Sequence, residues 1–322
     1  MKYRAFGKTG IQVSEVGYGT WGIGGGLWQG SEDDQSMQAL HRAIDLGLNF
    51  VDTALGYGKG HSERLVARLL KDRKERIYIA TKIPPKNGKW PARSGTKLHD
   101  VFPHEYIIEC TEQSLQNLQV DSIDIQQFHV WNDEWAEDSE WSDAIGKLKE
   151  QGKIRHFGVS INNHEPENAL KLGATGKVDT LQVIYNIFDQ APEDMLFPFC
   201  QENKIGVIVR VPLDEGGLTG SITPQSTFPE GDFRNRYFRD ERKQQVVERV
   251  LRLKQLLDPE AQSVPELALR FILSHPAIST VIPGMRTTRN VEANCGVSDG
   301  SLLSGKLLAE LKNHRWDRNF YH

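Results

Sequence analysis

One local pattern recurs along most of the chain: an amphipathic helical stretch, a glycine or a turn, and then a short strand of β-branched residues that ends in polar side chains. In residues 36–54, Met37, Leu40 and Ile44 fall on one helical face, Gly47 supplies a C-terminal stop, and residues 48–51 form the strand. Later copies occupy residues 62–82, 105–129, 144–160, 166–186, 195–211 and 267–284. With residues 13–21 as an opening strand, the sequence predicts eight strands joined by helices.

This alternation constrains the fold class, because strands separated by helices form a parallel sheet. No Pro/Gly/Ser-rich linker or low-complexity run divides the chain. We therefore predict an α/β fold with a single domain over residues 1–322, a (β/α)8 TIM barrel with a short N-terminal extension. The alternative is an open doubly wound sheet, which would carry a G-x-G-x-x-G turn before its first helix. Residues 22–26 read GIGGG, but no helical pattern follows until about Ser31, so we interpret them as a flexible loop.

Two connections are longer than the usual few residues. One spans residues 84–103 after the third strand, and the other runs from about 218 to 239 after the seventh. Long loops at the C-terminal ends of barrel strands are where such a fold holds its binding site.

Composition removes several classes of function. The 322 residues are 38% hydrophobic and 25% charged with a net charge of −4, which gives no reason to expect nucleic acid or an anionic membrane as a partner. No stretch approaches the roughly 20 apolar residues of a transmembrane helix, and the N-terminus lacks a signal peptide. Cys110, Cys200 and Cys295 are widely spaced, which fits free thiols in a reducing compartment, so the cytoplasm is the expected location. We assign no metal site, and no heptad run indicates an oligomer.

Chemically useful side chains end three successive strands. Asp52 ends the second strand, Lys82 the third and His129 the fourth, while Tyr57 follows Asp52 closely enough to reach the same mouth. A phenol with a pKa of about 10 is a poor acid at neutral pH unless a cation such as Lys82 favours the phenolate. Asp52 would keep Lys82 charged, and His129 could polarise a substrate oxygen. These four residues predict a site that moves protons.

Eight segments then stand in a specific order and spacing: FGKTGIQVSEVGYGTW, FVDTALGYGKGHSE, IATK, DIQQFH, GKIRHFGVS, LQVIYN, VPLDEGGLTG and LRFILSHPAISTVIPGMRTTRNVEANCG. Through them the chain resembles the aldo-keto reductase family over nearly its whole length. The resemblance implies a (β/α)8 barrel that uses NADPH, or less often NADH, to reduce an aldehyde or ketone. It also implies a catalytic tetrad of Asp52, Tyr57, Lys82 and His129, in which Tyr57 donates a proton to the carbonyl oxygen and His129 fixes the carbonyl.

The same resemblance implies a cofactor path. Ser160 and Gln182 would hold the nicotinamide amide, with Asn162 displaced by one position from the Ser-Asn pair of many members. Arg210 stands where many members stack a tyrosine on the nicotinamide, and the backbone of residues 211–220 would follow the pyrophosphate. The full set of expected cofactor contacts is Thr20, Trp21, Asp52, Ser160, Asn162, Gln182, Arg210, Val211, Pro212, Leu213, Glu215, Gly216, Leu218, Gly284, Arg286, Asn290 and Asn294.

The last of these residues surround a predicted helix start at about Thr287. Helix N-termini attract phosphate, and Arg286 lies just before this one with Arg289 in its first turn. Arg286 suits the 2′-phosphate of NADPH, so we expect NADPH to bind at least tenfold more tightly than NADH, about 1.4 kcal/mol.

Aromatic residues near the strand ends are candidates for the wall of the substrate site. They are Trp21, Trp90 and Trp131, beside Tyr57 and His129. The segment 227–238, with Arg234 and Arg236, could fold over the cofactor or the substrate. The substrate itself is a small carbonyl compound, and a sugar, a small aldehyde, a diketone and a steroid all remain open.

Two other functions use the same features. A Schiff-base lyase would need a neutral Lys82, which an adjacent Asp52 opposes. A non-catalytic NADPH-binding regulatory subunit is the second alternative, a role to which members of this family have been put.

Overall fold

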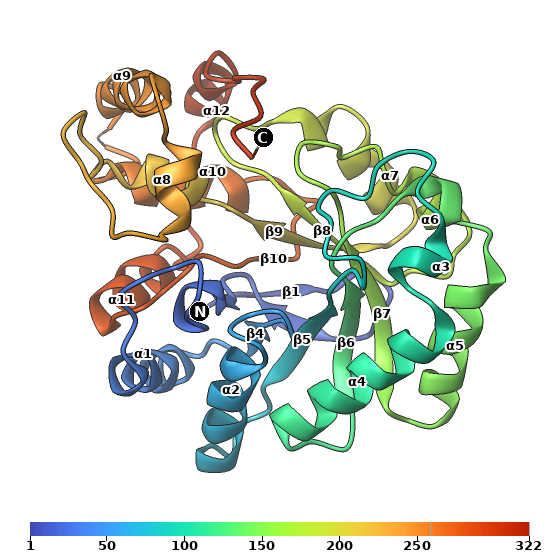
Figure 1. The fold of residues 1–322 in the computed structure, drawn as a ribbon. Coiled ribbons are helices and arrows are strands. Elements are labelled where there is room, and N and C mark those ends of the chain that lie inside the picture. The colour runs from blue at the N-terminus through green and yellow to red at the C-terminus, as the bar shows by residue number, and fades with distance from the viewer. Residues whose placement is uncertain (258, 322) are drawn as a thin grey trace.

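The computed structural model describes residues 1–257 and 259–321 and shows eight parallel strands curled into a barrel (Figure 1). The strands are β3 (Tyr18–Gly19), β4 (Phe50–Asp52), β5 (Tyr78–Ile83), β6 (Ile123–Phe128), β7 (Ile154–Ser160), β8 (Thr180–Ile184), β9 (Gly206–Arg210) and β10 (Thr280–Val281). They are hydrogen-bonded in sequence order. Parallel bridges join Val16 to Val281 and Gly19 to Gly284, so the first strand meets the last and the barrel closes.

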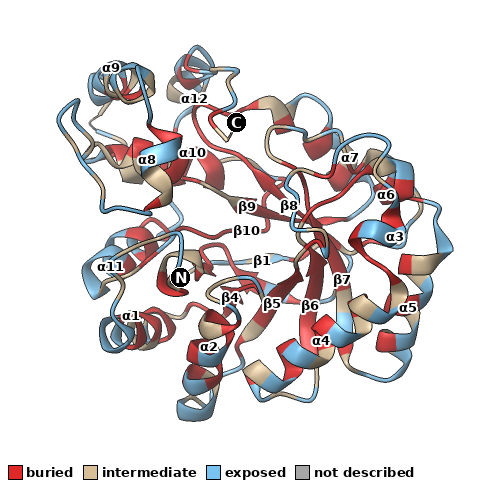
Figure 2. Ribbon diagram, in the orientation of Figure 1, coloured by how far each residue is buried: buried red, intermediate tan, exposed pale blue. Residues whose placement is uncertain are grey.

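Helices surround the barrel and turn their exposed residues outward (Figure 2). The longer ones are α1 (Asp33–Asp45), α2 (His61–Asp72), α4 (His104–Leu118), α5 (Ser139–Glu150), α7 (Leu196–Glu202), α9 (Arg242–Lys254), α10 (Val264–Leu273), α11 (Thr288–Gly296) and α12 (Gly305–Lys312). The shorter ones are η1 (Trp21–Ile23), α3 (Leu98–Val101), η2 (Asp133–Trp135), α6 (Leu170–Ala174), η3 (Ala191–Glu193), η4 (Asp214–Thr219) and α8 (Phe233–Tyr237). Across the described residues, no helix has the length and apolar character that crossing a membrane requires.

The predicted opening strand, residues 13–21, is wrong as a single element. Its first part belongs to an antiparallel hairpin of β1 (Tyr3–Ala5) and β2 (Gln12–Ser14), and its later part forms the short β3 of the barrel. One run of residues cannot pair antiparallel with β1 and parallel with β4 at the same time, so the chain divides between the two sheets. The hairpin forms the expected N-terminal extension and places Phe6 against Phe50 at the base of the barrel.

The register of the strands places a polar layer at the C-terminal mouth. Phe50, Ala80 and Ile125 belong to one buried apolar cluster inside the barrel. Side chains alternate along a strand, so the residues two positions later point inward as well, one layer higher. Those residues are Asp52, Lys82 and Gln127, and Lys82 is directly paired with Gln127 in the β5–β6 register.

Several smaller expectations are confirmed. Met37, Leu40 and Ile44 of α1 are buried. The three cysteines are free and buried. The predicted strand at residues 48–51 runs instead from Phe50 to Asp52, and the loops after β5 and β9 are long but each contains a short helix, α3 and α8.

Candidate active site

A cleft of about 1130 Å³ opens among the loops that follow the C-terminal ends of the barrel strands. Most of the residues predicted from the sequence line it. They are Thr20, Trp21, Asp52, Tyr57, Trp90, His129, Ser160, Asn162, Gln182, Arg210, Val211, Pro212, Leu213, Glu215, Gly216, Gly284, Arg286 and Asn290. Leu218, Asn294 and Trp131 do not line it.

Lys82 lies beneath the floor of the cleft and is fully buried. Its ammonium group donates to Asp52 Oδ1, to the backbone oxygen of Thr53 at 2.8 Å and to the Tyr57 hydroxyl at 3.3 Å. Burial lowers the pKa of Lys82, but the charges and hydrogen bonds of Asp52 and Tyr57 outweigh burial, and the pKa is raised. Lys82 is therefore a charged ammonium whose three N–H groups all have acceptors.

Asp52 is the centre of a buried hydrogen-bond network. Its Oδ2 accepts from the side-chain amides of Gln182 at 2.8 Å and Gln127 at 3.1 Å, while Oδ1 receives Lys82. Each carboxylate oxygen thus has donors, which stabilises its negative charge out of water. Gln127 was not predicted from the sequence, although it lies on β6 two residues after the inward-facing Ile125 and therefore on the same face.

Tyr57 reaches the cleft from the loop between β4 and α2, a conformation that depends on Gly58. Gly58 has φ = 60°, and a Cβ atom there would overlap the carbonyl oxygen of Gly24. Burial raises the pKa of Tyr57, Lys82 lowers it and Asp52 raises it again, with a net increase. The expected lowering by Lys82 is present but smaller than the effect of burial. Tyr57 is a neutral phenol at neutral pH, and it accepts from Lys82 with its oxygen.

His129 lies next to Tyr57, with ring centroids 5.7 Å apart, and its other ring neighbour is Trp90 at 5.8 Å. Burial, followed by the nearby charges of Lys82 and Arg210, holds the pKa of His129 well below its usual value. The imidazole is therefore neutral. Its buried Nδ1 has no hydrogen-bond partner within the described part of the chain.

The wall beyond the tetrad carries the residues expected at the nicotinamide. Arg210 donates to the backbone oxygen of Ile161 and to Asn163 Oδ1, both at 2.8 Å, and its buried Nε has no partner among the described residues. Asn162 is largely committed to the protein, because its amide nitrogen donates to Ala92 O at 3.1 Å and to Glu165 at 2.8 Å. Asn162 thus ties loops together as well as lining the cleft.

The next part of the wall, residues 211–216, is a strained loop. Val211, Asp214 and Glu215 all have positive φ, at 55°, 50° and 52°, without being glycine. Gly216 continues the turn at φ = 100°. Leu218 turns its fully buried side chain into the core because η4 packs on α10, so its side chain is not part of the wall.

The far end of the cleft meets the N-terminus of α11, as predicted. Thr287 is the N-cap residue, and its side chain accepts from Asn290 N at 3.2 Å. Arg286 flanks this end and donates to the backbone oxygen of Gln29 at 2.8 Å. Asn294 lies on the inward side of α11 and is buried, whereas Arg289 is exposed and does not line the cleft.

Two loops meet across the cleft. Phe233 N donates to Leu27 O at 2.8 Å, and Gln29 N donates to Asp232 at 3.3 Å. Arg234 binds Asp232 through two side-chain hydrogen bonds of 2.8 Å and lies over the ring of Trp28. The segment 227–238 therefore does fold over the cleft, with the guanidinium of Arg234 engaged by the protein itself.

The tryptophans differ in position. Trp21 and Trp90 line the cleft, and Trp21 contacts the rings of Tyr57 and Phe233. Trp131 was expected to line the substrate site, and this is wrong: it is fully buried, contacts other core aromatics and donates its indole N–H to Asp133 at 2.9 Å. The chain turns inward immediately after His129, which sequence position alone does not reveal.

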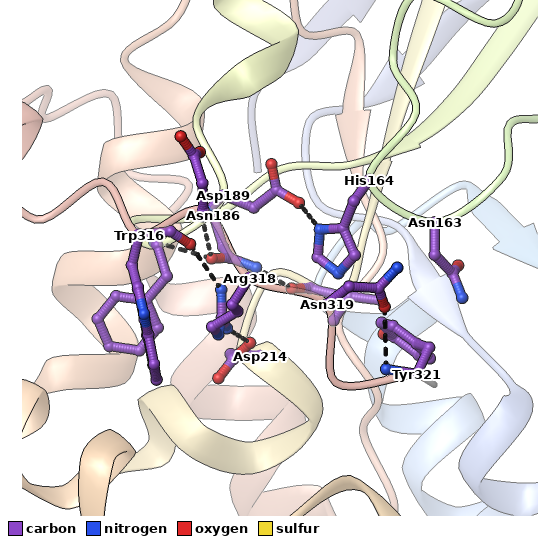
Figure 3. A network of polar contacts seen from close by, with 12 residues as sticks. Asn163, His164, Asn186, Asp189, Asp214, Trp316, Arg318, Asn319 and Tyr321 are labelled. Atoms are coloured by element: carbon purple, nitrogen blue, oxygen red, sulfur yellow. Dashed lines mark hydrogen bonds and ion pairs between the residues drawn. The ribbon is translucent and has the colours of Figure 1, made fainter. Parts of the chain in front are cut away.

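The C-terminal tail is an element that was not predicted from the sequence. It runs over the loops after β7, β8 and β9 and brings Tyr321 to the cleft (Figure 3). Arg318 of the tail pairs with Asp214, and Trp316 N donates to Phe188 O at 2.8 Å. The aromatic composition of residues 316–321 is the one available sequence signal for a docked tail.

No cluster of three or more His, Cys, Asp or Glu side chains that could hold a metal ion occurs in residues 1–257 and 259–321. The residues that line the cleft instead fit a dinucleotide. The buried acid–base group of Asp52, Tyr57 and His129 lies at one end of the cleft, and Arg286 with the N-terminus of α11 lies at the other.

Comparisons with known proteins agree with this geometry. The sequence model described as the Aldo/keto reductase family matches residues 15–315. The aldo-keto reductase YhdN of Bacillus subtilis is 33% identical over 312 residues, covering 94% of this chain and 91% of that protein. An NADH-specific methylglyoxal reductase of Escherichia coli is 32% identical over 305 residues, covering 91% and 92%. The structure is similar to glycerol dehydrogenase AKR11B4 from Gluconobacter oxydans, with a TM-score of 0.78, 29% identity, and coverage of 94% and 92%.

Fold, site and sequence thus lead to the same assignment: this chain belongs to the aldo/keto reductase family.

Proposed function

We propose that this protein reduces an aldehyde or ketone to an alcohol with NADPH, and that Tyr57 is the general acid. The observation that carries the proposal is the hydrogen bond from Lys82 to the Tyr57 hydroxyl oxygen. Because that oxygen accepts from Lys82, the phenolic proton is free to be donated toward the cleft. The Lys82 charge also stabilises the phenolate that proton transfer leaves behind.

The roles of the other residues follow from their protonation states. Neutral His129 can donate an N–H to a carbonyl oxygen placed between it and Tyr57, which holds the carbonyl and polarises it. Asp52 keeps Lys82 charged and fixed. A bound nicotinamide supplies the hydride. Ser160, Gln182 and Arg210 would hold its ring end, and residues 211–216 its pyrophosphate.

Preference for NADPH is part of the proposal. Named relatives include an NADH-specific enzyme and an NADP(+) enzyme of Schizosaccharomyces pombe, so family membership leaves the preference open. Arg286 at the N-terminus of α11 supports a 2′-phosphate site, because a guanidinium and helix N–H groups both favour phosphate. We expect Arg286→Ala to weaken NADPH binding by about tenfold, about 1.4 kcal/mol, and to leave NADH binding nearly unchanged. An equal loss for both cofactors would contradict this assignment.

The Schiff-base alternative is disfavoured by the same geometry. A nucleophilic amine must be neutral, whereas Asp52 and Tyr57 hold Lys82 in its charged form. Family membership makes an oxidoreductase the expected activity, and the complete tetrad supports turnover.

The test of the proposal is a panel of aldehydes and ketones offered with NADPH and, separately, with NADH. Consumption of reduced cofactor that depends on the carbonyl compound is the expected result. Tight NADPH binding without turnover on any member of a broad panel would favour the regulatory alternative.

A further inference from the structure

Two adjacent carboxyl groups, Asp214 and Glu215, are buried in the strained loop of the cleft wall. Their residues are 1% and 8% exposed, and both have positive φ. Positive φ in residues other than glycine costs on the order of 1–3 kcal/mol each and persists where the surroundings hold it in place. The loop therefore holds two acidic side chains close together and out of water, an arrangement that is costly unless each carboxyl group is paired or protonated.

The two acids have different partners. Asp214 forms an ion pair with Arg318 (Figure 3). Its Oδ1 also accepts from the Tyr237 hydroxyl at 2.8 Å. Glu215 Oε1 accepts from the Tyr321 hydroxyl at 2.6 Å. Within the described residues, no ion pair reaches Glu215. Arg318 of the tail therefore pairs with Asp214, whereas the partner that the tail gives Glu215 is the phenol of Tyr321.

Other charged groups face Glu215 without pairing with it. Arg210 at the end of β9 is bonded to Ile161 O and Asn163, and Arg234 of α8 is bonded to Asp232. The pKa of Glu215 is raised to about 7 as the net result of several effects. Burial is the largest and raises it, the hydrogen bond from Tyr321 lowers it, Asp214 raises it, and Arg210 and Arg234 lower it.

His164 belongs to the same surroundings. It follows β7, contacts the ring of Tyr321 at 5.7 Å between centroids and pairs with Asp189 at 2.5 Å (Figure 3). Its ring nitrogen is therefore engaged by Asp189, and among the described residues no ion pair joins it to Glu215.

Glu215 lies in the wall between Leu213 and Gly216, both of which line the cleft. This is the stretch that the proposed function assigns to the cofactor pyrophosphate, which carries negative charge. An ionised carboxylate beside that group would be destabilised, because like charges at short range favour the neutral acid.

We propose that the dinucleotide binds with uptake of one proton by Glu215, and that the Tyr321 hydroxyl sets the pH at which this uptake begins. The inference rests on the proposed function, since it needs a dinucleotide in this cleft. It gives the C-terminal tail a defined role: Tyr321 stabilises the ionised form of Glu215 in the free protein.

The tail is held firmly enough for this role. Arg242 donates to Phe320 O at 2.8 Å, and Arg236 donates to Tyr321 O at 3.1 Å. The Tyr321 ring also contacts those of Phe233 and Tyr237. Tyr321 is therefore held in place through both its backbone and its ring.

The test is isothermal titration calorimetry with NADPH and NADH at pH 8, in two buffers of different ionisation enthalpy. A Glu215 pKa of about 7 leaves roughly 0.9 of the carboxyl ionised at pH 8, so binding should take up close to that fraction of a proton. NADH is included because a 2′-phosphate ionises near pH 6 and could itself exchange protons. Uptake with both cofactors is the expected result.

Two variants separate this role from a structural one. Glu215→Gln should abolish uptake and bind about tenfold more tightly than the unmodified protein at pH 8 but equally at pH 6, because only the protonated fraction is competent. Tyr321→Phe keeps the ring but removes the hydrogen bond, so the pH at which affinity begins to fall should move upward. Glu137→Gln, at an exposed carboxyl remote from the cleft, is the matched control and should behave as the unmodified protein.

Binding of both cofactors without proton uptake would overturn the inference while leaving the proposed function intact, and so would uptake that survives in Glu215→Gln. Failure of both cofactors to bind would overturn the inference together with the proposed function. If Glu215→Gln does not fold, an unchanged pH midpoint in Tyr321→Phe is enough to overturn it.

Discussion

Replacing Asp52 by Asn isolates the buried charge pair of the site at nearly constant volume. The carboxylate accepts Lys82 on one oxygen and the amides of Gln127 and Gln182 on the other. An asparagine in its place removes the negative charge and points its own N–H₂ group at side chains that also donate hydrogen bonds. Lys82 is fully buried and would be left with neutral acceptors, among them Thr53 O and the Tyr57 hydroxyl. Removing one partner of a buried ion pair costs about 3–5 kcal/mol, a large share of the about 5–15 kcal/mol that stabilises a domain.

The assay is urea unfolding as a function of pH. In the unmodified protein the pKa of Lys82 is raised, so its contribution is fully present below the unfolded value of about 10.4 and is lost as the pH rises through the folded value. In Asp52→Asn, the charge of Asp52 no longer opposes burial, so burial outweighs the remaining effect of Tyr57 and the pKa of Lys82 falls. The penalty is then largest at low pH and is relieved as the pH rises toward 10.4, so the two stability curves should converge.

The matched control is the double variant Asp52→Asn/Lys82→Met, which removes the buried ammonium as well. It should be more stable than the single variant at pH 7, because no unpaired charge remains. A single variant that loses less than about 1 kcal/mol at every pH, or a double variant no more stable than the single one, would refute the reasoning.

Three further outcomes are expected. Gly58→Ala should destabilise the protein by about 1–3 kcal/mol in urea unfolding and lower kcat, since a Cβ would overlap Gly24 O and displace Tyr57; wild-type turnover would contradict this. Trp131→Ala should lower stability by about 3–5 kcal/mol yet leave the ranking of carbonyl substrates unchanged, whereas Trp90→Ala, at the cleft, should change KM values at little cost in stability. Because the pKa of His129 lies well below 6.5, kcat/KM should show no titration of this residue between about pH 6 and 7.5. The stability of the protein should fall as the pH drops below the unfolded pKa of about 6.5. A rate inflection near pH 6.5 that His129→Gln removes would count against a neutral imidazole.

The barrel was predictable because its repeat is local. Helical periodicity, a stop signal and a β-branched strand recur within about 20–30 residues each time, and the C-terminal ends of parallel strands must meet at one mouth. This logic brought Asp52, Lys82 and His129 together, and the structure confirms that they converge with Tyr57.

What the sequence could not predict depends on contacts between distant segments. Tyr321 contacts Glu215 from more than 100 positions away in the sequence, and no periodic pattern predicts that the tail packs there. Trp131 enters the core because of how one loop turns, and residues 13–21 divide between two sheets because each half finds a different partner strand. The net rise in the pKa of Tyr57 likewise depends on burial, a property of the assembled cleft and not of the residue pair.

The most direct test of the proposed chemistry is Tyr57→Phe, which removes one hydroxyl and keeps the ring against Trp21 and His129. We predict that kcat for carbonyl reduction falls by roughly 10²–10⁴, the usual contribution of a positioned general acid, while the Kd for NADPH measured by fluorescence changes by less than about threefold. Wild-type turnover across several aldehydes with normal NADPH binding would show that Tyr57 is not the proton donor.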